Sequence, residues 1–240
     1  MNQELICARG LTKLYGAKPA LDHIDLNIGR GRIVGLLGPN GSGKTTFIKL
    51  MCGLLQPTSG TLEIDGHAPG VETKAVISYL PDRMYFADWM KTCDLTDFFA
   101  DFYADFDRAK AKEMFSALGI GPGERLKTMS KGTKEKAQLA LIMSRKAQLY
   151  LLDEPIGGVD PAARDFILNT ILTNYNENGT VMLSTHLISD IERVLDEAVF
   201  LKSGKVVRHD SVDNIREQEG KSVDQLFREI FAYGITEEGR

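Results

Sequence analysis

The segment 38–46 has the residue types and spacing that can hold a phosphate chain. It reads GPNGSGKTT, which matches the phosphate-binding pattern G-x-x-x-x-G-K-[ST], and it lies between an expected buried strand at 33–37 and an expected helix from residue 46. Glycines permit a tight turn whose N–H groups point inward at phosphates. Lys44 can reach the β- and γ-phosphates, and the Thr45 hydroxyl can ligate Mg²⁺. The sequence therefore predicts a nucleoside triphosphate site formed by Gly38, Asn40, Gly41, Ser42, Gly43, Lys44, Thr45 and Thr46.

A second group of chemically capable residues is the carboxylate pair Asp153-Glu154. It follows the apolar run 149–152, which predicts a buried strand. Ligands of open α/β sheets bind at the carboxyl ends of the strands, so both carboxylates are expected to face the same phosphates as Lys44. We expect Asp153 to support Mg²⁺ through its water shell and Glu154 to polarise the attacking water.

Strands that alternate with helices must position these groups. The alternation predicts a largely parallel sheet preceded by strands within the first 35 residues. A helical pattern from about 96 to 118 carries an aromatic stripe, which indicates either the core face of a small helical lobe or a docking groove for a partner helix, and the two can coexist. Further strands are expected at 61–64, 75–80, 148–152, 181–184 and 198–201, and helices at about 131–145, from 161, after 186 and in two short pieces from 211. The aromatic stripe consists of Phe98, Phe99, Phe102, Tyr103 and Phe106.

Four further segments, in order and at characteristic spacing, complete a family pattern. Ser130-Lys131-Gly132-Thr133 precedes a long helix, Gly157-Gly158-Val159-Asp160 follows the carboxylate pair, His186 ends a strand, and Tyr15 lies upstream of the phosphate loop. With these segments the chain resembles, from about residue 5 to residue 205, the nucleotide-binding subunit of an ABC transporter. The tetrapeptide 130–133 stands where that family has its LSGGQ signature, and 157–160 stands at its D-loop.

The resemblance implies a fold and a set of partners. The expected fold is an α/β P-loop NTPase (RecA-like) core with an N-terminal antiparallel β subdomain and an inserted α-helical subdomain. The whole chain, 1–240, would be one nucleotide-binding domain, with the helical insertion at about 87–146 and a short helical tail at about 211–240. The family binds ATP with Mg²⁺ between two such subunits, as homodimers or heterodimers, and drives separately encoded membrane-spanning permease subunits.

The resemblance also implies roles for individual residues. Ser130 and the Gly132 amide would offer a hydroxyl, an N–H group and a helix dipole to the γ-phosphate held by the opposing subunit. His186 would donate to the γ-phosphate and help to fix the attacking water. The Tyr15 ring would stack on adenine, with a packing tyrosine as the alternative. Asp160 would organise the dimer contact or simply cap the helix that begins at Pro161.

Two positions depart from the family pattern. Lys131 and Thr133 replace a glycine and a glutamine of the signature, a form that resembles the single-domain ATPases of bacterial ABC-2-type exporters. Asp82 stands after Pro81, where the family usually has a glutamine that touches Mg²⁺ and signals to the membrane subunit. A carboxylate can ligate Mg²⁺ but cannot donate a hydrogen bond when ionised. We expect Asp82 to keep a metal or coupling role, with closure of a turn as the alternative.

Composition limits the remaining possibilities. A net charge of −4 over 240 residues argues against non-specific nucleic-acid binding, so no nucleic-acid partner is expected. No stretch approaches the roughly 18 consecutive apolar residues of a membrane span, the N-terminus does not resemble a signal peptide, and the three cysteines are scattered. These features, with the resemblance, predict a cytoplasmic protein that is peripheral on the inner face of the cell membrane.

The expected activity is ATP hydrolysis that drives transport, with export favoured by the ABC-2-type resemblance. One alternative is a soluble ABC-type ATPase that acts on the ribosome or on DNA, although the chain has only one such domain and no sustained heptads. Another alternative is a regulatory or sensing module. A phosphate loop alone would also fit a kinase or GTPase, which the signature and D-loop disfavour.

Overall fold

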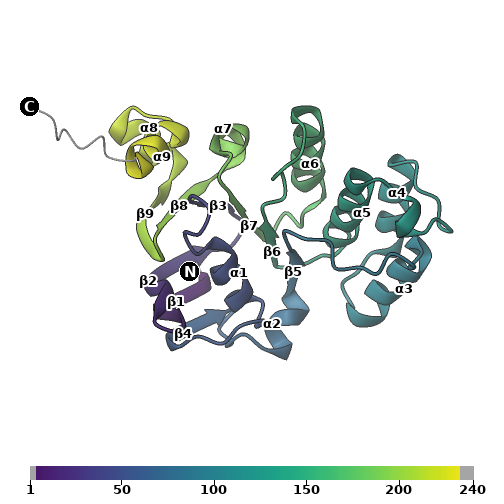
Figure 1. Ribbon diagram of the computed structural model, residues 1–240, viewed down its shortest axis with the longest axis horizontal. Helices are drawn as coiled ribbons and strands as arrows, with labels where there is room; N and C mark the ends of the chain where they lie inside the picture. Colours follow the sequence, from purple (N-terminus) through teal and green to yellow (C-terminus); the bar gives the residue numbers. More distant parts are fainter. Residues whose placement is uncertain (1–3, 233–240) are drawn as a thin grey trace, which may run out of the picture.

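The computed structural model describes residues 4–232, which form two sheets and the helices that surround them (Figure 1). The strands are β1 Glu4–Tyr15, β2 Lys18–Gly29, β3 Ile33–Leu37, β4 Ser59–Ile64, β5 Ile77–Leu80, β6 Leu149–Asp153, β7 Thr180–Thr185, β8 Glu197–Lys202 and β9 Lys205–Ser211. The helices are α1 Lys44–Met51, α2 Val71–Val76, α3 Thr92–Phe102, α4 Arg108–Ala117, α5 Lys131–Met143, α6 Pro161–Asn174, α7 Ile188–Ile191, α8 Val212–Glu219 and α9 Val223–Phe231.

The smaller sheet has the strand order β2-β1-β4, and all of its pairs are antiparallel. Its two long strands bury roughly every second side chain, as expected for a sheet with one face on a core and one face toward solvent. Those buried side chains pack with α1 and with one face of the larger sheet in a single apolar cluster. The N-terminal sheet therefore backs the helix that follows the phosphate loop.

The larger sheet has the strand order β5-β6-β7-β3-β8-β9 and is parallel except for β9. Every residue of β3, β6 and β7 is buried, which is the pattern of a parallel strand that is covered on both faces. Because these three strands are neighbours, their carboxyl ends lie at one edge of the sheet. The fold thus brings the residues that follow Leu37, Leu152 and Thr185 to one place.

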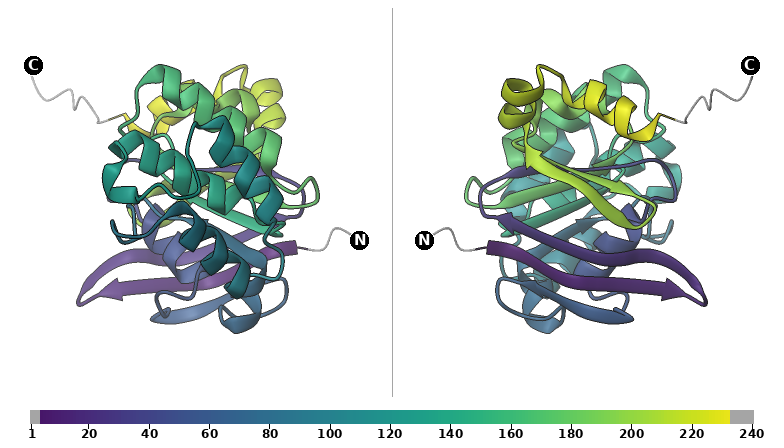
Figure 2. Two further views of the ribbon diagram at one scale, coloured as in Figure 1. Left: turned by 90° about the vertical axis from the view of Figure 1, so that its right-hand side faces the viewer. Right: turned by 90° about the vertical axis from the view of Figure 1, so that its left-hand side faces the viewer.

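Helices α3, α4 and α5 form a helical lobe at the opposite side of the molecule from α8 and α9 (Figures 1 and 2). One side chain of the lobe reaches deep into the core: Arg145, directly after α5, is 2% exposed. Its guanidinium donates to the Ala75 and Ile77 carbonyls, binds the Asp105 carboxylate through Nε at 2.9 Å and Nη2 at 3.1 Å, and lies 3.8 Å from the centre of the Tyr103 ring. Arg145 therefore joins α5, the α3–α4 connection and the start of β5.

The structure confirms most expected elements, corrects two of them and adds one strand. The expected strand at 75–80 begins only at Ile77, because residues 71–76 form α2, whose Gly70 N–H binds the Thr73 hydroxyl. The expected helix at 96–118 is two helices, because the Asp107 carboxylate accepts the N–H groups of Ala109 and Lys110 and starts a new helix there.

The additional strand is β9, for which no strand was expected. Ser203 (φ 49°) and Gly204 (φ 82°) both adopt positive φ between Lys202 and its partner Lys205. This is a two-residue hairpin turn, for which Ser-Gly between two strand-like runs is a recognisable signal. The hairpin also touches the phosphate loop, since the Gly204 N–H donates to the Ser42 carbonyl at 2.9 Å.

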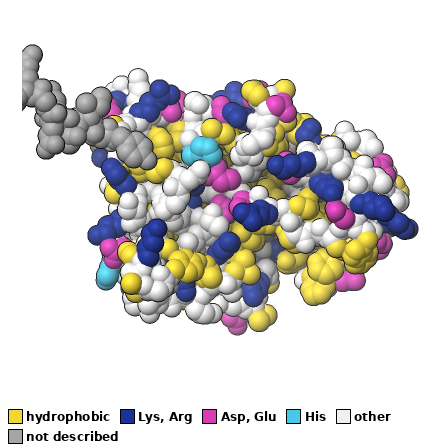
Figure 3. All heavy atoms as spheres, viewed as in Figure 1, with side chains coloured by type: hydrophobic (Ala, Val, Ile, Leu, Met, Phe, Trp, Pro, Cys, Tyr) yellow, Lys and Arg dark blue, Asp and Glu magenta, His cyan; other side chains and the backbone are white. Residues whose placement is uncertain are grey.

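The aromatic stripe of the lobe has a buried part and an exposed part. Phe99 is 2% exposed and packs against the rings of Tyr103 and Phe106, so these residues belong to the lobe core. Phe98 and Phe102 are 43% and 70% exposed, and hydrophobic side chains gather on this part of the surface (Figure 3).

Candidate active site

The phosphate loop has the backbone that its glycines predict. Gly41 and Gly43 have φ values of +80° and +114°, which favour glycine, and a Cβ on Gly43 would lie 2.5 Å from the Ala20 carbonyl oxygen. A Cβ on Gly38 would lie 2.4 Å from the Leu201 oxygen. Gly43 is also the N-cap of α1 and provides no side-chain acceptor. The first turn of α1 therefore directs its N–H groups and dipole at the loop, without a side-chain cap.

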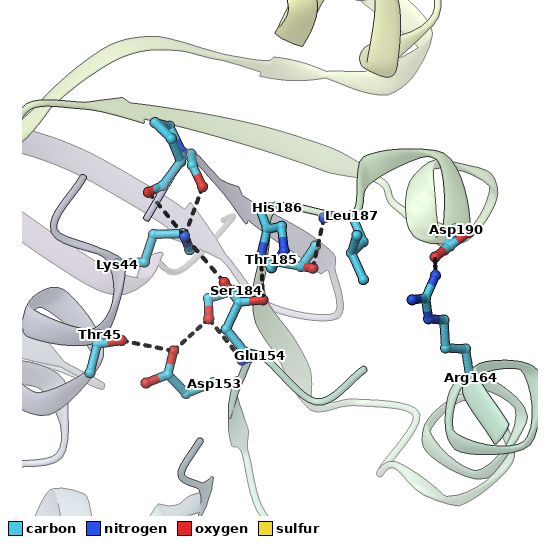
Figure 4. A network of polar contacts seen from close by, with 12 residues as sticks. Lys44, Thr45, Asp153, Glu154, Arg164, Ser184, Thr185, His186, Leu187 and Asp190 are labelled. Carbon is cyan, nitrogen blue, oxygen red and sulfur yellow. Dashed lines mark hydrogen bonds and ion pairs between the residues drawn. The ribbon is translucent and has the colours of Figure 1, made fainter. Parts of the chain in front are cut away.

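Lys44 is buried with its ammonium surrounded by oxygen atoms. The side chain is 5% exposed, and Nζ lies 2.7 Å from the Gly38 carbonyl oxygen and 3.3 Å from that of Pro39. The third neighbour is the Glu154 carboxylate, whose Oε1 lies 3.2 Å from Nζ (Figure 4). The expected phosphate-binding lysine and the expected general base are thus in direct contact.

Asp153 ends β6 and is 1% exposed. Its Oδ1 accepts hydrogen bonds from the Ser184 hydroxyl at 2.6 Å and the Thr45 hydroxyl at 3.2 Å. Burial raises the pKa of this carboxyl above its usual range, against the two hydrogen bonds that favour the ionised form. Oδ2 has no hydrogen-bond partner among the described residues. A cation would therefore stabilise the ionised carboxylate.

Glu154 has an unusual backbone for a residue with a side chain. Its φ is +50°, in the left-handed region, and its N–H donates to both the carbonyl oxygen of Ser184 at 3.1 Å and the hydroxyl of Ser184 at 3.0 Å. Such a conformation costs of order 1–3 kcal/mol and persists where surrounding contacts enforce it. Here the contacts of β7 enforce it and turn the carboxylate toward Lys44.

His186 completes this side of the site. It follows β7, and its Nδ1 lies 3.1 Å from Glu154 Oε2. The imidazole is 41% exposed, so Nε2 can be turned toward a ligand outside the chain. Lys44 and His186 therefore flank opposite oxygens of one carboxylate (Figure 4).

The unsatisfied polar atoms of this site are those that a Mg²⁺–triphosphate would use. Besides Asp153 Oδ2, the buried Ser42 hydroxyl lacks a partner among residues 4–232. Within the same residues, no three His, Cys, Asp or Glu side chains are grouped to hold a metal ion by themselves. This donor set suits Mg²⁺, which takes one or two protein oxygens and completes its shell with phosphate and water. The residues present fit the nucleotide and the metal.

The signature residues lie in the helical lobe, away from this cluster. Ser130 is the N-cap of α5, and its hydroxyl contacts only the Thr133 N–H at 3.1 Å and the Thr133 hydroxyl at 2.8 Å among the described residues. Gly132 lies in the first turn of α5, with open space where a Cβ would be. The structure therefore does not bring Ser130 and Gly132 to the phosphate loop of the same chain.

Three other predicted residues have different surroundings. Tyr15 is 52% exposed at the end of β1, with Lys13 Nζ 5.6 Å from its ring centre. Asp82 follows β5, lies 3.8 Å from the Arg83 guanidinium and makes no hydrogen bond to Thr45 or Asp153 among the described residues. The Asp160 carboxylate accepts from the Ala163 N–H, so Asp160 caps α6.

Sequence reasoning did not assign a role to Ser184. This buried residue of β7 donates to Asp153 and accepts from the Glu154 N–H, so it fixes both carboxylates at once. The signal in the sequence was a hydroxyl residue two positions before His186, at the end of the strand that was expected to lie beside the carboxylate pair. Ser184 belongs to the candidate site as a positioning residue.

Comparisons with known proteins agree with this geometry. The family model described as ABC transporter matches residues 21–157. The chain is 31% identical to the ABC transporter ATP-binding protein MJ1023 of Methanocaldococcus jannaschii, over 88% of this chain and 79% of that protein. It is 29% identical to the daunorubicin resistance ATP-binding protein DrrA3 of Streptomyces coeruleorubidus, over 98% of this chain and 78% of that protein.

Solved structures show the same fold. The ATP-binding subunit of an ABC transporter superimposes with a TM-score of 0.82 at 28% identity, over 94% of this chain and 99% of that chain. An ATP-binding cassette, MJ0796, in a post-hydrolysis state with ADP and Pi superimposes with a TM-score of 0.74 at 21% identity, over 86% and 98% of the two chains. By its phosphate loop, its paired carboxylates and these relatives, the chain belongs to the ATP-binding subunits of ABC transporters and is an ATPase.

Proposed function

We propose that this chain is the ATP-hydrolysing subunit of an ABC exporter, that it dimerises around Mg-ATP, and that it drives separate membrane-spanning subunits. The observation that carries this proposal is the division of the site. The phosphate loop, both carboxylates and His186 meet in one cluster, whereas Ser130 lies on another part of the chain. A second copy, or a similar subunit, would supply the missing serine.

The chemistry follows from the contacts of Glu154. When phosphate oxygens replace the Gly38 and Pro39 carbonyls around Lys44, the ammonium can leave Glu154 Oε1. Glu154 can then accept the proton of the attacking water, while His186 holds the other carboxylate oxygen. Bound Mg²⁺ would neutralise charge on the phosphates, with Thr45 and Asp153 positioned to hold it.

The membrane-spanning partner has a suitable docking place. A groove of about 500 Å³ runs between the end of β5 and the lobe, and we call it the lobe groove. The buried Tyr79 hydroxyl at its wall has no partner among the described residues. A largely apolar groove whose wall carries one unpartnered hydroxyl suits a short amphipathic helix of a partner. Its principal lining residues are Lys74, Tyr79, Asp82, Met84, Tyr85, Phe99, Tyr103 and Arg145.

Asp82 is placed to connect this groove with the nucleotide. The loop 81–84 lines the lobe groove on one side and, on the other, a small cavity bordered by Asp153 and Glu154. We propose that Asp82 therefore keeps a coupling role, with a metal-ligating role if the loop closes on the site. In Asp82→Asn protein, loss of permease-stimulated turnover with normal basal turnover would support coupling. Unchanged basal and stimulated turnover would remove the role.

The proposals of export and of a peripheral location are supported by the relatives. SkfE of Bacillus subtilis, a peptide export ATP-binding protein, is 28% identical over 90% of this chain and 92% of its own length. No helix among residues 4–232 has the length and apolarity to cross a bilayer. We propose a peripheral position on the inner face of the cell membrane, held there by the partner.

The deciding experiment uses tagged Glu154→Gln protein and gently solubilised membranes in Mg-ATP. Stoichiometric recovery of a polytopic membrane protein, together with a dimer of this chain or a pair with a similar subunit, would support the proposal. Recovery from the cytosol alone, with ribosomes, DNA or nothing attached, would contradict it and favour a soluble ABC-type ATPase. A membrane partner without transport activity would instead identify a regulatory module.

A further inference from the structure

Gln138 is a buried polar residue that the active site described above does not use. It lies in the middle of α5 and is 3% exposed. Its Oε1 atom has no hydrogen-bond partner among the described residues. An orphaned buried acceptor costs about 1–3 kcal/mol of stability. Such a residue in a folded core needs an explanation.

The surroundings of Gln138 provide one. It lines a cavity of about 60 Å³ that lies between α5, the loop after β5 and the end of β6. Asp153, whose Oδ2 is also without a partner, borders the same cavity. The volume has room for more than one water, since a single water needs about 10–15 Å³ on this measure. The polar residues around the cavity are Asp82, Arg83, Glu135, Gln138, Asp153 and Glu154.

The unpartnered atoms of this cavity are acceptors, which water molecules in the cavity can satisfy. Gln138 Oε1, Asp153 Oδ2 and Glu154 Oε1 are all oxygen atoms without a hydrogen bond in the described part of the chain, although Glu154 Oε1 has an ion-pair contact with Lys44. Water can donate to two acceptors at once and can itself be bound to a cation. Magnesium retains several waters when proteins bind it.

We propose that Gln138 is a positioning residue for the metal's water shell, acting through waters that fill this cavity between α5 and Asp153. The proposal rests on the proposed Mg-ATP site. Gln138 would accept from a cavity water, and that water would be oriented toward the metal side of Asp153. The helical lobe would thereby contribute to the Mg²⁺ affinity of its own chain's nucleotide site through the middle of α5, about two turns from Ser130.

The test measures nucleotide affinity without turnover. Binding of a fluorescent ADP analogue is compared in EDTA and in saturating Mg²⁺, and the ratio of the two affinities gives the magnesium enhancement. Gln138→Met keeps the length of the side chain and removes its polar atoms. We expect unchanged affinity in EDTA and a magnesium enhancement lowered about three- to tenfold, which is less than the roughly 10–100-fold typical of groups bonded directly to metal ligands, because Gln138 acts through water.

Stability separates this role from a structural one. Because Gln138→Met removes an orphaned acceptor, its thermal unfolding midpoint in EDTA should equal or exceed that of the wild type. Leu139→Met is the matched control, since Leu139 borders the same cavity without polar atoms. It should leave the magnesium enhancement unchanged.

Three outcomes would overturn the proposal. One is an unchanged magnesium enhancement in Gln138→Met, and another is an equal loss in Leu139→Met. The third is a lower unfolding midpoint with parallel losses of affinity in EDTA and in Mg²⁺, which would show a packing role. Failure of the proposed function looks different, because wild-type protein would then bind no nucleotide or show no magnesium enhancement.

Discussion

The functional side chains at the carboxyl-terminal edge of the parallel sheet and those of the helical lobe differ in the contacts that they make within the chain. At the sheet edge, Lys44, Asp153 and Glu154 each contact other polar groups of the same chain. In the lobe, Ser130 contacts only its own helix turn among the described residues, and Phe102 is 70% exposed. Under the proposed function, the edge is a preassembled half of a catalytic site, and the lobe presents groups that a second subunit or a membrane partner would complete.

The largest expected effect tests the edge. Glu154→Gln removes the general base but keeps a side chain that can stay near Lys44, so we expect turnover to fall at least about 100-fold while ATP binding persists. Steady-state phosphate release and equilibrium ATP binding would measure the two properties. Wild-type turnover in this variant would exclude Glu154 as the base.

The second-largest effect is expected at Arg145, which joins the lobe to the sheet. Arg145→Met leaves the Asp105 carboxylate and two carbonyls without their buried cation, so the free energy of unfolding should fall by about 3–5 kcal/mol. Urea denaturation of the nucleotide-free protein would measure it. Arg193→Met, at an exposed ion pair with Asp165, is the control and should cost under about 1 kcal/mol. Equal losses in the two variants would show that Arg145 does not join lobe and core.

A smaller effect is expected at Ser130, the residue of the lobe that is proposed to face a phosphate. Ser130→Asp keeps an N-cap acceptor for the Thr133 N–H but places a negative charge where the opposing γ-phosphate is expected. We expect the folded stability to be retained and turnover to fall roughly ten- to a hundredfold, from the loss of a charge-assisted hydrogen bond of about 1.5–3 kcal/mol.

The control for Ser130 is the same substitution at another serine cap. Ser222 caps α9 in the same way, through the Gln225 N–H, and lies outside the site. Ser222→Asp should leave turnover unchanged. If Ser130→Asp also leaves turnover unchanged, the lobe serine does not face a phosphate and the two regions do not combine into one site.

The smallest expected effect concerns the stability that the folded chain loses by burying the Asp153 carboxylate. Burial raises the pKa of Asp153, so the folded chain keeps this proton at a pH where the unfolded chain has lost it. Above the ordinary pKa of an aspartate, about 3.9, the folded state is therefore penalised as the pH rises through the folded-state pKa. Asp153→Asn should raise the unfolding temperature in EDTA by about 2–4 °C at neutral pH.

A pH series checks this sign. The gain in Asp153→Asn should disappear below about pH 4, where both states of the wild type carry the proton. Asp165→Asn changes an exposed aspartate at a surface ion pair and should show no gain at any pH. A wild type that is more stable than Asp153→Asn at neutral pH would show that the hydrogen bonds from Ser184 and Thr45 outweigh burial.

The two regions also differ in how far the sequence predicted them. The sheet edge was predictable because its residues form local motifs: the glycines of 38–43 and the carboxylates after an apolar run each determine their own surroundings. The lobe was expected to be helical, but its division into α3 and α4 was not predicted, because these boundaries depend on contacts between distant residues. Nothing near residue 145 in the sequence indicates that its guanidinium reaches Ala75 and Asp105, or that the chain must break at 103–107 to meet it.

The same distinction explains Ser184 and Gln138. Each is a common polar residue whose role depends on an atom more than 10 residues away in the chain: Ser184 on Asp153, and Gln138 on a cavity that it shares with Asp153. The local sequence around each residue says nothing about its partners. The positive φ of Glu154 could not be predicted from the sequence either, because it is enforced by β7 rather than by the neighbouring residues in the chain.

The burial of Arg145 has a mechanical consequence. Turning the lobe about a distant axis would pull the guanidinium away from the Ala75 and Ile77 carbonyls, whereas turning it about Arg145 itself would preserve these bonds. The Arg145 side chain is then the point about which the lobe can turn without breaking them. Because Arg145 also lines the lobe groove, a partner that binds in the groove would act close to this turning point. Ser130, at the far end of α5, would travel the longer arc.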